Sequence, residues 1–323
     1  MTVVATYPPS YICRMLAWLW TLLGVALILI TGRDVLHEMF HPVETGSISR
    51  WVMHRSWRLI RLVARGNRSI TVQAGPLILV LVALTWAVLL VVGWALIYWP
   101  RLPKGFNISP GVPASAAHGL GAALYVSLAD VTTMGAGNLT PTGSLARIAT
   151  TLEAFVGPAI LTAWVTWVLS IYPVLADRRA FAYQSDLLRR TYGDPISVVR
   201  DCPANAIVEI LFSLTRRMLE ITAELRQSRV TYYFQSEGVK ASLTAQLPFV
   251  LYLAREAERA GATYSIHHHG RMLRMAIDEF LDDIGAAFVH AQGCSPDEIL
   301  AALARDHFLP VPGTAEFEAL LNG

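Results

Sequence analysis

The chain contains little charge and few cysteines. Only 15% of its 323 residues are charged, and its three cysteines are far apart. So low a charge content argues against an ordinary soluble enzyme of this length. Cys13, Cys202 and Cys294 lack Cys-x-x-Cys spacing. They therefore predict free thiols rather than a disulfide framework or a zinc ribbon.

Signatures of common ligand-binding domains are also absent from the sequence. No Gly-x-Gly-x-x-Gly run follows a predicted strand, and no cyclic-nucleotide-binding β-roll is visible. What charge there is lies unevenly. Residues 1–176 carry 11 Lys/Arg and 5 Asp/Glu, whereas residues 177–323 carry 15 and 19. This asymmetry predicts a membrane half followed by a mildly acidic soluble domain.

Three apolar segments approach the roughly 20 residues that a membrane-spanning helix needs. They are Met15–Thr31, Pro76–Trp99 and Ile148–Leu175. The first shows no small-x-small cleavage site, so we expect a retained helix rather than a signal peptide. The second carries four aromatic residues that we expect to anchor it at the membrane interface. These are Trp86, Trp94, Tyr98 and Trp99.

The distribution of basic residues predicts the orientation. The linker 32–75 contains seven arginines, whereas the loop 100–147 contains three basic residues. Because positive residues stay on the cytoplasmic side, we expect an outside N-terminus and a cytoplasmic C-terminal half in the cell (inner) membrane. Within the linker, Ile48–Ala64 mixes arginines with apolar residues. It predicts an amphipathic helix that lies on the inner leaflet or packs against the cytosolic domain.

A short apolar stretch lies between the second and third segments. Ala122–Val131 is helix-permissive but too short to span, and a polar, glycine-rich run, Thr132–Thr140, follows it. Irregular backbone at membrane depth is tolerated only where protein surrounds it or water lines it. Gly135 and Gly137 occupy alternate positions, where glycine readily adopts left-handed conformations. The pattern predicts a re-entrant loop.

The motif and its flanks resemble the potassium-channel superfamily. The family pattern has Thr-Thr-x-Gly-x-Gly-Asp, then Thr-Pro, an arginine, Leu-Glu and a hinge glycine. Here the corresponding residues are Thr132, Thr133, Met134, Gly135, Ala136, Gly137, Asn138, Thr140, Pro141, Arg147, Leu152, Glu153 and Gly157. The resemblance covers residues 76–176, about a third of the chain.

This resemblance implies a homotetramer that conducts cations passively through a filter of backbone carbonyls. The ion ligands would be the Thr133 hydroxyl and the carbonyls of residues 133–136. Gly157, followed by Pro158, would be the gating hinge of the inner helix. It further implies no enzymatic activity, no cofactor besides permeant K⁺ or another monovalent cation, and no nucleic acid. The expected partners are membrane lipids and further copies of the chain.

Three departures from the family pattern bear on selectivity. Ala136 replaces the aromatic residue that packs behind the filter, and Asn138 replaces an aspartate at the outer mouth. Asp130 places a carboxylate in the pore helix, where the family has threonine or a small residue. An acid at this depth is a functional hypothesis, and we expect it to support the filter, as does Glu153. Relaxed selectivity between potassium and sodium follows as an expectation.

A second motif competes with this interpretation. His37-Glu38-Met39-Phe40-His41 is a His-Glu-x-x-His sequence, which on a helix can hold zinc. Apart from Asp34 and Asp130, the membrane half offers no aspartate as a third ligand, so a zinc-dependent intramembrane protease is a remote alternative. A non-catalytic metal site formed by Asp34, His37 and His41 is a weak one. We expect instead that these side chains lie at the membrane interface and pack against the linker or the cytosolic domain.

The C-terminal half predicts a helical domain. Helical periodicity covers Ala204–Arg229, Ala241–Ala260 and Arg271–Ala291. Ser295 is the expected N-cap of a helix through Arg305, and Thr314–Leu320 is a last short one. His267-His268-His269 is expected to start a helix rather than bind metal. Asp278-Glu279 and Asp282-Asp283 are expected to form a solvated face.

The sequence therefore predicts an all-α membrane protein with three transmembrane helices, a re-entrant pore loop and an α-helical cytosolic domain. The predicted domains are an N-terminal helix (1–31), a basic linker (32–75), a pore domain (76–176) and a cytosolic domain (177–323). A cation channel is the expected function. The alternative from another class is a non-conducting membrane sensor or scaffold that keeps the channel fold.

Overall fold

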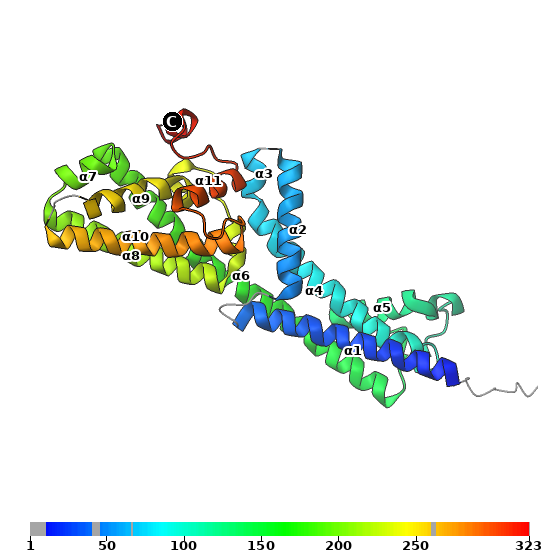
Figure 1. Cartoon of the computed structure of the whole chain (residues 1–323). Coiled ribbons are helices and arrows are strands. Elements are labelled where there is room, and N and C mark those ends of the chain that lie inside the picture. Colours follow the sequence, from blue (N-terminus) through cyan, green and yellow to red (C-terminus); the bar gives the residue numbers. More distant parts are fainter. Residues whose placement is uncertain (1–10, 41–45, 66, 260–262, 323) are drawn as a thin grey trace, which may run out of the picture. The chain divides into compact units, whose positions relative to one another are not determined.

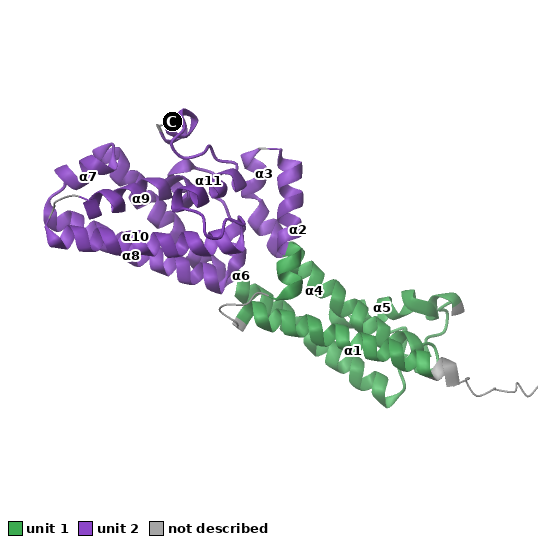
Figure 2. Cartoon of the chain, viewed as in Figure 1, with its two compact units in different colours: residues 1–52, 80–168 green, residues 53–79, 169–323 purple. Residues whose placement is uncertain are grey.

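A computed structural model describes residues 11–40, 46–65, 67–259 and 263–322. The protein is almost entirely helical (Figure 1). It divides into two compact units (Figure 2). Unit 1 comprises residues 1–52 and 80–168, and unit 2 comprises residues 53–79 and 169–323. Three helices cross the boundaries between these ranges: α2 (Ser47–Ala64), α4 (Ala74–Tyr98) and α6 (Ser144–Tyr192).

Three helices are long and apolar enough to span a membrane, as predicted. These candidate spans are Met15–Met39, Ala74–Arg101 and Ser144–Tyr192. The first lies in α1 (Tyr11–Phe40) and the third is the whole of α6. Each is longer than the apolar run in the sequence, because the helix continues through flanking polar residues such as Arg178 and Arg179.

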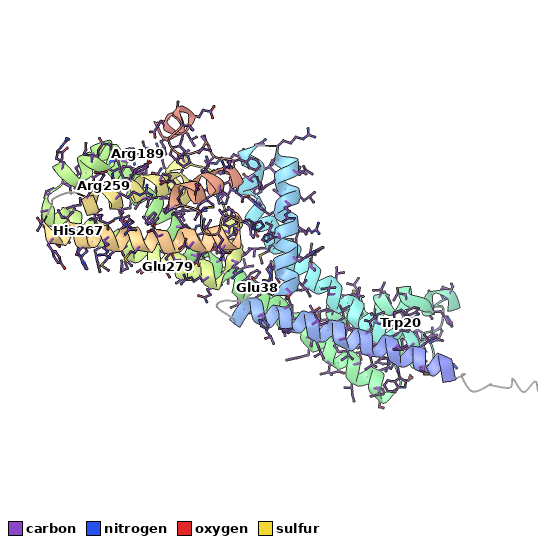
Figure 3. All side chains as sticks on the ribbon, in the orientation of Figure 1. Trp20, Glu38, Arg189, Arg259, His267 and Glu279 are labelled. Atoms are coloured by element: carbon purple, nitrogen blue, oxygen red, sulfur yellow. The ribbon has the colours of Figure 1, made fainter. Side chains whose placement is uncertain are left out.

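Unit 1 is held together by close approach of α1 and α4. A side chain at Gly24 of α1 would meet the Gly93 carbonyl of α4 at 2.4 Å, so glycine is required there. Small residues allow such contact between membrane helices. Nearby lies Trp20 of α1 (Figure 3). Its ring centroid is 5.0 Å from that of Trp99, in the 3₁₀ turn Trp99–Arg101. The Arg101 guanidinium donates to the Thr21 hydroxyl at 3.0 Å.

The segment between α4 and α6 packs on this pair. It contains a 3₁₀ turn (Ala114–Ala117), the helix α5 (Gly119–Val131), and a two-stranded antiparallel sheet. Strand β1 (Phe106–Ile108) pairs with β2 (Leu139–Pro141), with Asn107 opposite Thr140. The buried face of α5, Phe106 and Leu139 belong to one apolar cluster with the end of α4. The sheet thereby fixes both ends of the loop that contains α5.

Three aromatic residues of α4 are buried inside the protein. Trp86, Trp94 and Tyr98 are 1%, 7% and 0% exposed. The prediction that they anchor the helix at the membrane interface is therefore wrong for these three. Trp86 packs against Trp167 of α6, with ring centroids 5.9 Å apart. Helix packing competes with the interface for large aromatic residues, and sequence alone does not separate the two uses.

Unit 2 is a helical bundle built on three long helices. They are α8 (Ala204–Gln227), α9 (Leu243–Arg259) and α10 (Tyr264–Ala287). Helix α10 packs against both others, and Gly270 permits contact with α9, since a side chain there would meet Ala257 at 2.7 Å. The shorter elements are α3 (Arg68–Val72), α7 (Pro195–Asp201), α11 (Pro296–Asp306), α12 (Ala315–Asn322) and the 3₁₀ turns Arg229–Tyr233 and Val239–Ala241.

All five helices predicted for this half are present, with shifted ends. The Ser295 N-cap is confirmed, and Ser295 forms a capping box with Glu298. Helix α10 begins at Tyr264, before the three histidines, and His267 lies within its first turns (Figure 3). Arg226 pairs with Glu279 at 2.8 Å and with Asp283 at 2.6 Å. The four acids at 278, 279, 282 and 283, which were expected to form a solvated face, are therefore partly engaged in ion pairs between α8 and α10.

The C-terminal part of α2 packs within unit 2. The Trp57 indole donates to Asp306 at 3.0 Å, and Arg61 pairs with the same carboxylate at 2.6 Å. The Tyr232 hydroxyl donates to it at 2.6 Å. The sequence left open whether this amphipathic helix lies on the inner leaflet or packs against the C-terminal domain. These contacts show that its C-terminal part packs against the C-terminal domain. Leu59, Leu62 and Val63 remain exposed on its other face.

Candidate functional site

The predicted pore helix is α5, a 13-residue helix that ends at Val131. Thr132 is its C-cap, and the Thr132 hydroxyl donates to the Leu128 carbonyl at 2.7 Å. The backbone N–H of Met134 and that of Gly135 both donate to the Ala129 carbonyl at 2.9 Å. The helix therefore ends in a tight turn made by the predicted filter residues.

The left-handed positions of this turn are Thr133, with φ +59°, and Gly135, with φ +72°. The sequence predicted left-handed backbone at two alternate positions, Gly135 and Gly137. The structure has two alternate left-handed positions, but they are Thr133 and Gly135. A β-branched residue in this conformation is strained, because its side chain crowds the backbone. Such strain persists only where the surrounding contacts impose it, and it often marks functional sites.

Backbone bonds within the turn occupy two of the carbonyls predicted to bind ions. The Gly135 carbonyl accepts from Gly137 N–H at 3.0 Å, and the Ala136 carbonyl accepts from Leu139 N–H at 2.9 Å. Residues 132–135 are exposed, with Met134 at 73%, whereas Ala136 is buried at 7%. In a single chain the segment is a hydrogen-bonded turn. Its role as an ion filter stays a prediction.

Two polar side chains brace the turn from behind. The Ala136 N–H donates to the carboxylate of Asp130, the interaction expected of an acid that replaces the missing aromatic. The Tyr125 hydroxyl donates to the side-chain carbonyl of Asn138 at 3.0 Å. Asp130 and Tyr125 both belong to α5, so helix and turn are fixed as one piece.

A buried carboxyl group lies behind α5. Glu153 of α6 is 0% exposed, accepts from the Tyr98 hydroxyl at 2.6 Å and contacts the Ser127 hydroxyl. Ser127 also contacts the Val91 carbonyl at 3.0 Å. The group therefore links α4, α5 and α6. The sequence had suggested Tyr98 only as an interface anchor and gave Ser127 no role, although a serine in the apolar run 122–131 was an available signal.

Gly157 lies directly against the end of α5. A side chain there would meet the Val131 carbonyl at 2.2 Å, which leaves no room for one. Helix α6 continues without a break through Gly157 and Pro158. The structure thus gives Gly157 a packing role at the base of the turn, whereas its use as a hinge stays a prediction.

The His-Glu-x-x-His motif does not assemble a metal site among the described residues. His41 lies outside them. Within the described ranges no three His, Cys, Asp or Glu side chains are placed to share a metal ion. Asp34 accepts hydrogen bonds from Ile48 N–H, Ser49 N–H, the Ser49 hydroxyl and the Trp86 indole. His37 accepts from Arg33 at 3.3 Å, and Glu38 is buried near the end of α1 (Figure 3).

Comparison with known proteins gives one distant relative. The chain is similar to the uncharacterized membrane protein YdjJ of Bacillus subtilis (strain 168), with 23% identity over 286 residues, which cover 86% of this chain and 81% of the relative. No family model matches the chain, and no solved structure matches it. Together with the three apolar helices, this similarity places the chain among all-α membrane proteins.

Proposed function

We propose that the chain forms a tetrameric cation channel of the potassium-channel type. The observation that carries the proposal is the short helix α5, which ends in a strained, exposed turn between two long apolar helices. Thirteen residues of helix are about 20 Å long, less than the ~30 Å hydrocarbon core of a bilayer. The segment therefore suits a re-entrant loop.

The end of α5 has the electrostatic character that a cation site requires. The carboxyl end of a helix carries a partial negative charge, and here it meets the turn 132–135. Four copies around one axis would place four such ends, with the Thr133 hydroxyls and the carbonyls of residues 133–136, around the pathway. We place the C-terminal unit in the cytoplasm on the strength of the arginine-rich linker.

The proposal includes relaxed selectivity. Ala136 offers little side-chain volume behind the filter, and Asn138 contributes no charge at the mouth. The bonds from Asp130 to Ala136 N–H and from Tyr125 to Asn138 replace part of the missing support. Conduction further requires the Gly135 and Ala136 carbonyls to turn toward the axis when the chains assemble.

A non-conducting sensor or scaffold is the second candidate. The observation that favours it is the engagement of the same two carbonyls in backbone bonds within one chain. If those bonds persist in the assembly, the pathway is closed. Oligomeric state and flux therefore have to be measured together.

Ion flux into liposomes that contain the purified protein tests the channel, with potassium and sodium compared. Gly135→Ala places a side chain at a φ of +72°, whereas Gly143→Ala nearby has open space and no such angle. We expect ion flux in the wild type and in Gly143→Ala, and loss of flux in Gly135→Ala. The native mass of the purified protein is expected to be that of four chains. No flux of either ion across pH, voltage and calcium would favour the sensor.

A further inference from the structure

A small cavity in unit 2 is lined by an unusual number of hydrogen-bond donors. Its volume is about 30 Å³, more than the ~10–15 Å³ that a single water needs by the same measure. Arginines reach it from α3 and α6, and an amide, three hydroxyls and an imidazole complete its polar lining. These residues are Arg68, Arg178, Arg179, Gln235, Ser236, Ser242, Thr244 and His307.

Three of the lining side chains have a buried nitrogen without a hydrogen-bond partner. They are Arg68 Nε, Gln235 Nε2 and His307 Nε2. His307 is only 4% exposed, and its Nδ1 lies 3.0 Å from the Thr244 hydroxyl. When Thr244 donates to Nδ1, the Nε2 atom carries the proton and is a donor. Each buried donor left unpaired costs about 1–3 kcal/mol, so three around one cavity require a reason.

The charges around the cavity leave a positive excess. No acidic residue lines it, and none of the ion pairs among the described residues uses Arg68, Arg178 or Arg179. Glu224 acts on Arg178 electrostatically. Burial, with Asp177 and Glu220 nearby, raises the pKa of Glu224 to about 7, so at neutral pH it is only partly ionised.

We propose that this cavity binds a phosphate-type oxyanion, held by Arg68, Arg178 and Arg179 with Gln235 and His307. A tetrahedral oxyanion offers several acceptor oxygens, which match guanidinium forks and single N–H donors together. Chloride also accepts hydrogen bonds from several sides, but it lacks the paired oxygens that a guanidinium fork binds in bidentate fashion. The anion is either free phosphate or the phosphate of an anionic lipid headgroup. The site does not depend on whether the protein conducts ions.

Binding is measured by calorimetry on the full-length protein in detergent. The probes are inorganic phosphate and soluble dihexanoyl phosphatidic acid, with dihexanoyl phosphatidylcholine as the lipid control. All are measured at one ionic strength, which is set with a chloride salt. Arg68→Gln removes the unpartnered Nε donor, together with the hydrogen bond from Arg68 Nη2 to the Ser236 carbonyl at 3.0 Å. Arg179→Gln removes a charge that lines the cavity. The Arg179 side chain makes no hydrogen bond among the described residues, so the variant is expected to fold. Arg216→Gln, an exposed arginine outside the cavity lining, is the matched control.

We expect both cavity variants to weaken binding about tenfold or more, and Arg216→Gln to match wild type. Phosphate binding with this pattern identifies a free-phosphate site. The same pattern for phosphatidic acid alone, with phosphatidylcholine inactive, identifies a headgroup site. The proposal is overturned if neither probe binds, if phosphatidylcholine binds equally, or if Arg216→Gln loses as much affinity as Arg179→Gln.

Discussion

The carboxylate of Asp34 accepts a hydrogen bond from the indole nitrogen of Trp86 at 3.0 Å. The same carboxylate accepts from the backbone N–H groups of Ile48 and Ser49, at the start of α2, and from the Ser49 hydroxyl. Asp34 therefore caps α2 from a distant position in the sequence and ties it to α1 and α4. Gly46 allows the approach, because a side chain there would meet Asp34 at 2.2 Å.

Asp34→Ala is expected to destabilise the protein by about 2–4 kcal/mol, since it leaves buried donors unpaired and removes a helix cap. Thermal unfolding in detergent measures the change. Asp282→Asn, an exposed acid in α10, is the control and is expected to stay within ~0.5 kcal/mol of wild type. If Asp34 acted only as a metal ligand, added zinc would stabilise the wild type but not the variant. In the presence of a chelator the variant would then be as stable as the wild type.

Gly157→Ala is expected to lower stability by about 1–3 kcal/mol, because the new methyl group would push against the Val131 carbonyl. Gly32→Ala in α1 is the matched helical control. It has nothing within 4 Å and is expected to gain up to about 1 kcal/mol. Unfolding midpoints of both variants decide the matter. Equal gains in the two would show that α6 does not rest against the end of α5.

Thr133→Gly is expected to raise stability by about 1 kcal/mol, because glycine adopts a φ of +59° without crowding. It also removes the hydroxyl that we propose as an ion ligand, so ion flux should fall in the same variant. Opposite changes in stability and flux are the signature of strain kept for function. A loss of stability would instead show that the hydroxyl and methyl contacts outweigh the strain.

Acidification is expected to destabilise unit 2 through His307. Burial, reinforced by Arg178, Arg61 and Arg68 and opposed by Asp306, lowers the pKa of this imidazole to about 4. The unfolded chain binds a proton near pH 6.5, whereas the folded chain resists it. Stability is therefore complete above pH 6.5 and is lost as the pH falls toward 4, by at most about 3 kcal/mol.

The His307→Gln variant isolates this contribution. Comparing unfolding free energies of wild type and variant between pH 7 and pH 4 cancels the other titrating groups. We expect the difference between the two to shrink as the pH falls. A difference that is constant with pH would mean that His307 titrates alike in both states.

Some features were predictable because they depend on local composition and spacing. The three apolar helices, the short α5, the amphipathic α2 and the Ser295 cap follow from hydrophobic length, helical periodicity and cap chemistry. The acid at Asp130 could be matched to an amide of the next turn, since the two are close in sequence. All of these interactions operate over a few residues, and the sequence shows them directly.

The tertiary structure alone decided which residues meet across long separations. It placed Asp34 at the start of α2, brought Tyr98 and Ser127 to Glu153, and gathered Arg68 with Arg178 and His307 around one cavity. It also put the left-handed turn at Thr133. Such contacts depend on how helices pack and where the chain reverses. Many pairings satisfy the same local pattern, so only packing and hydrogen-bond satisfaction select among them.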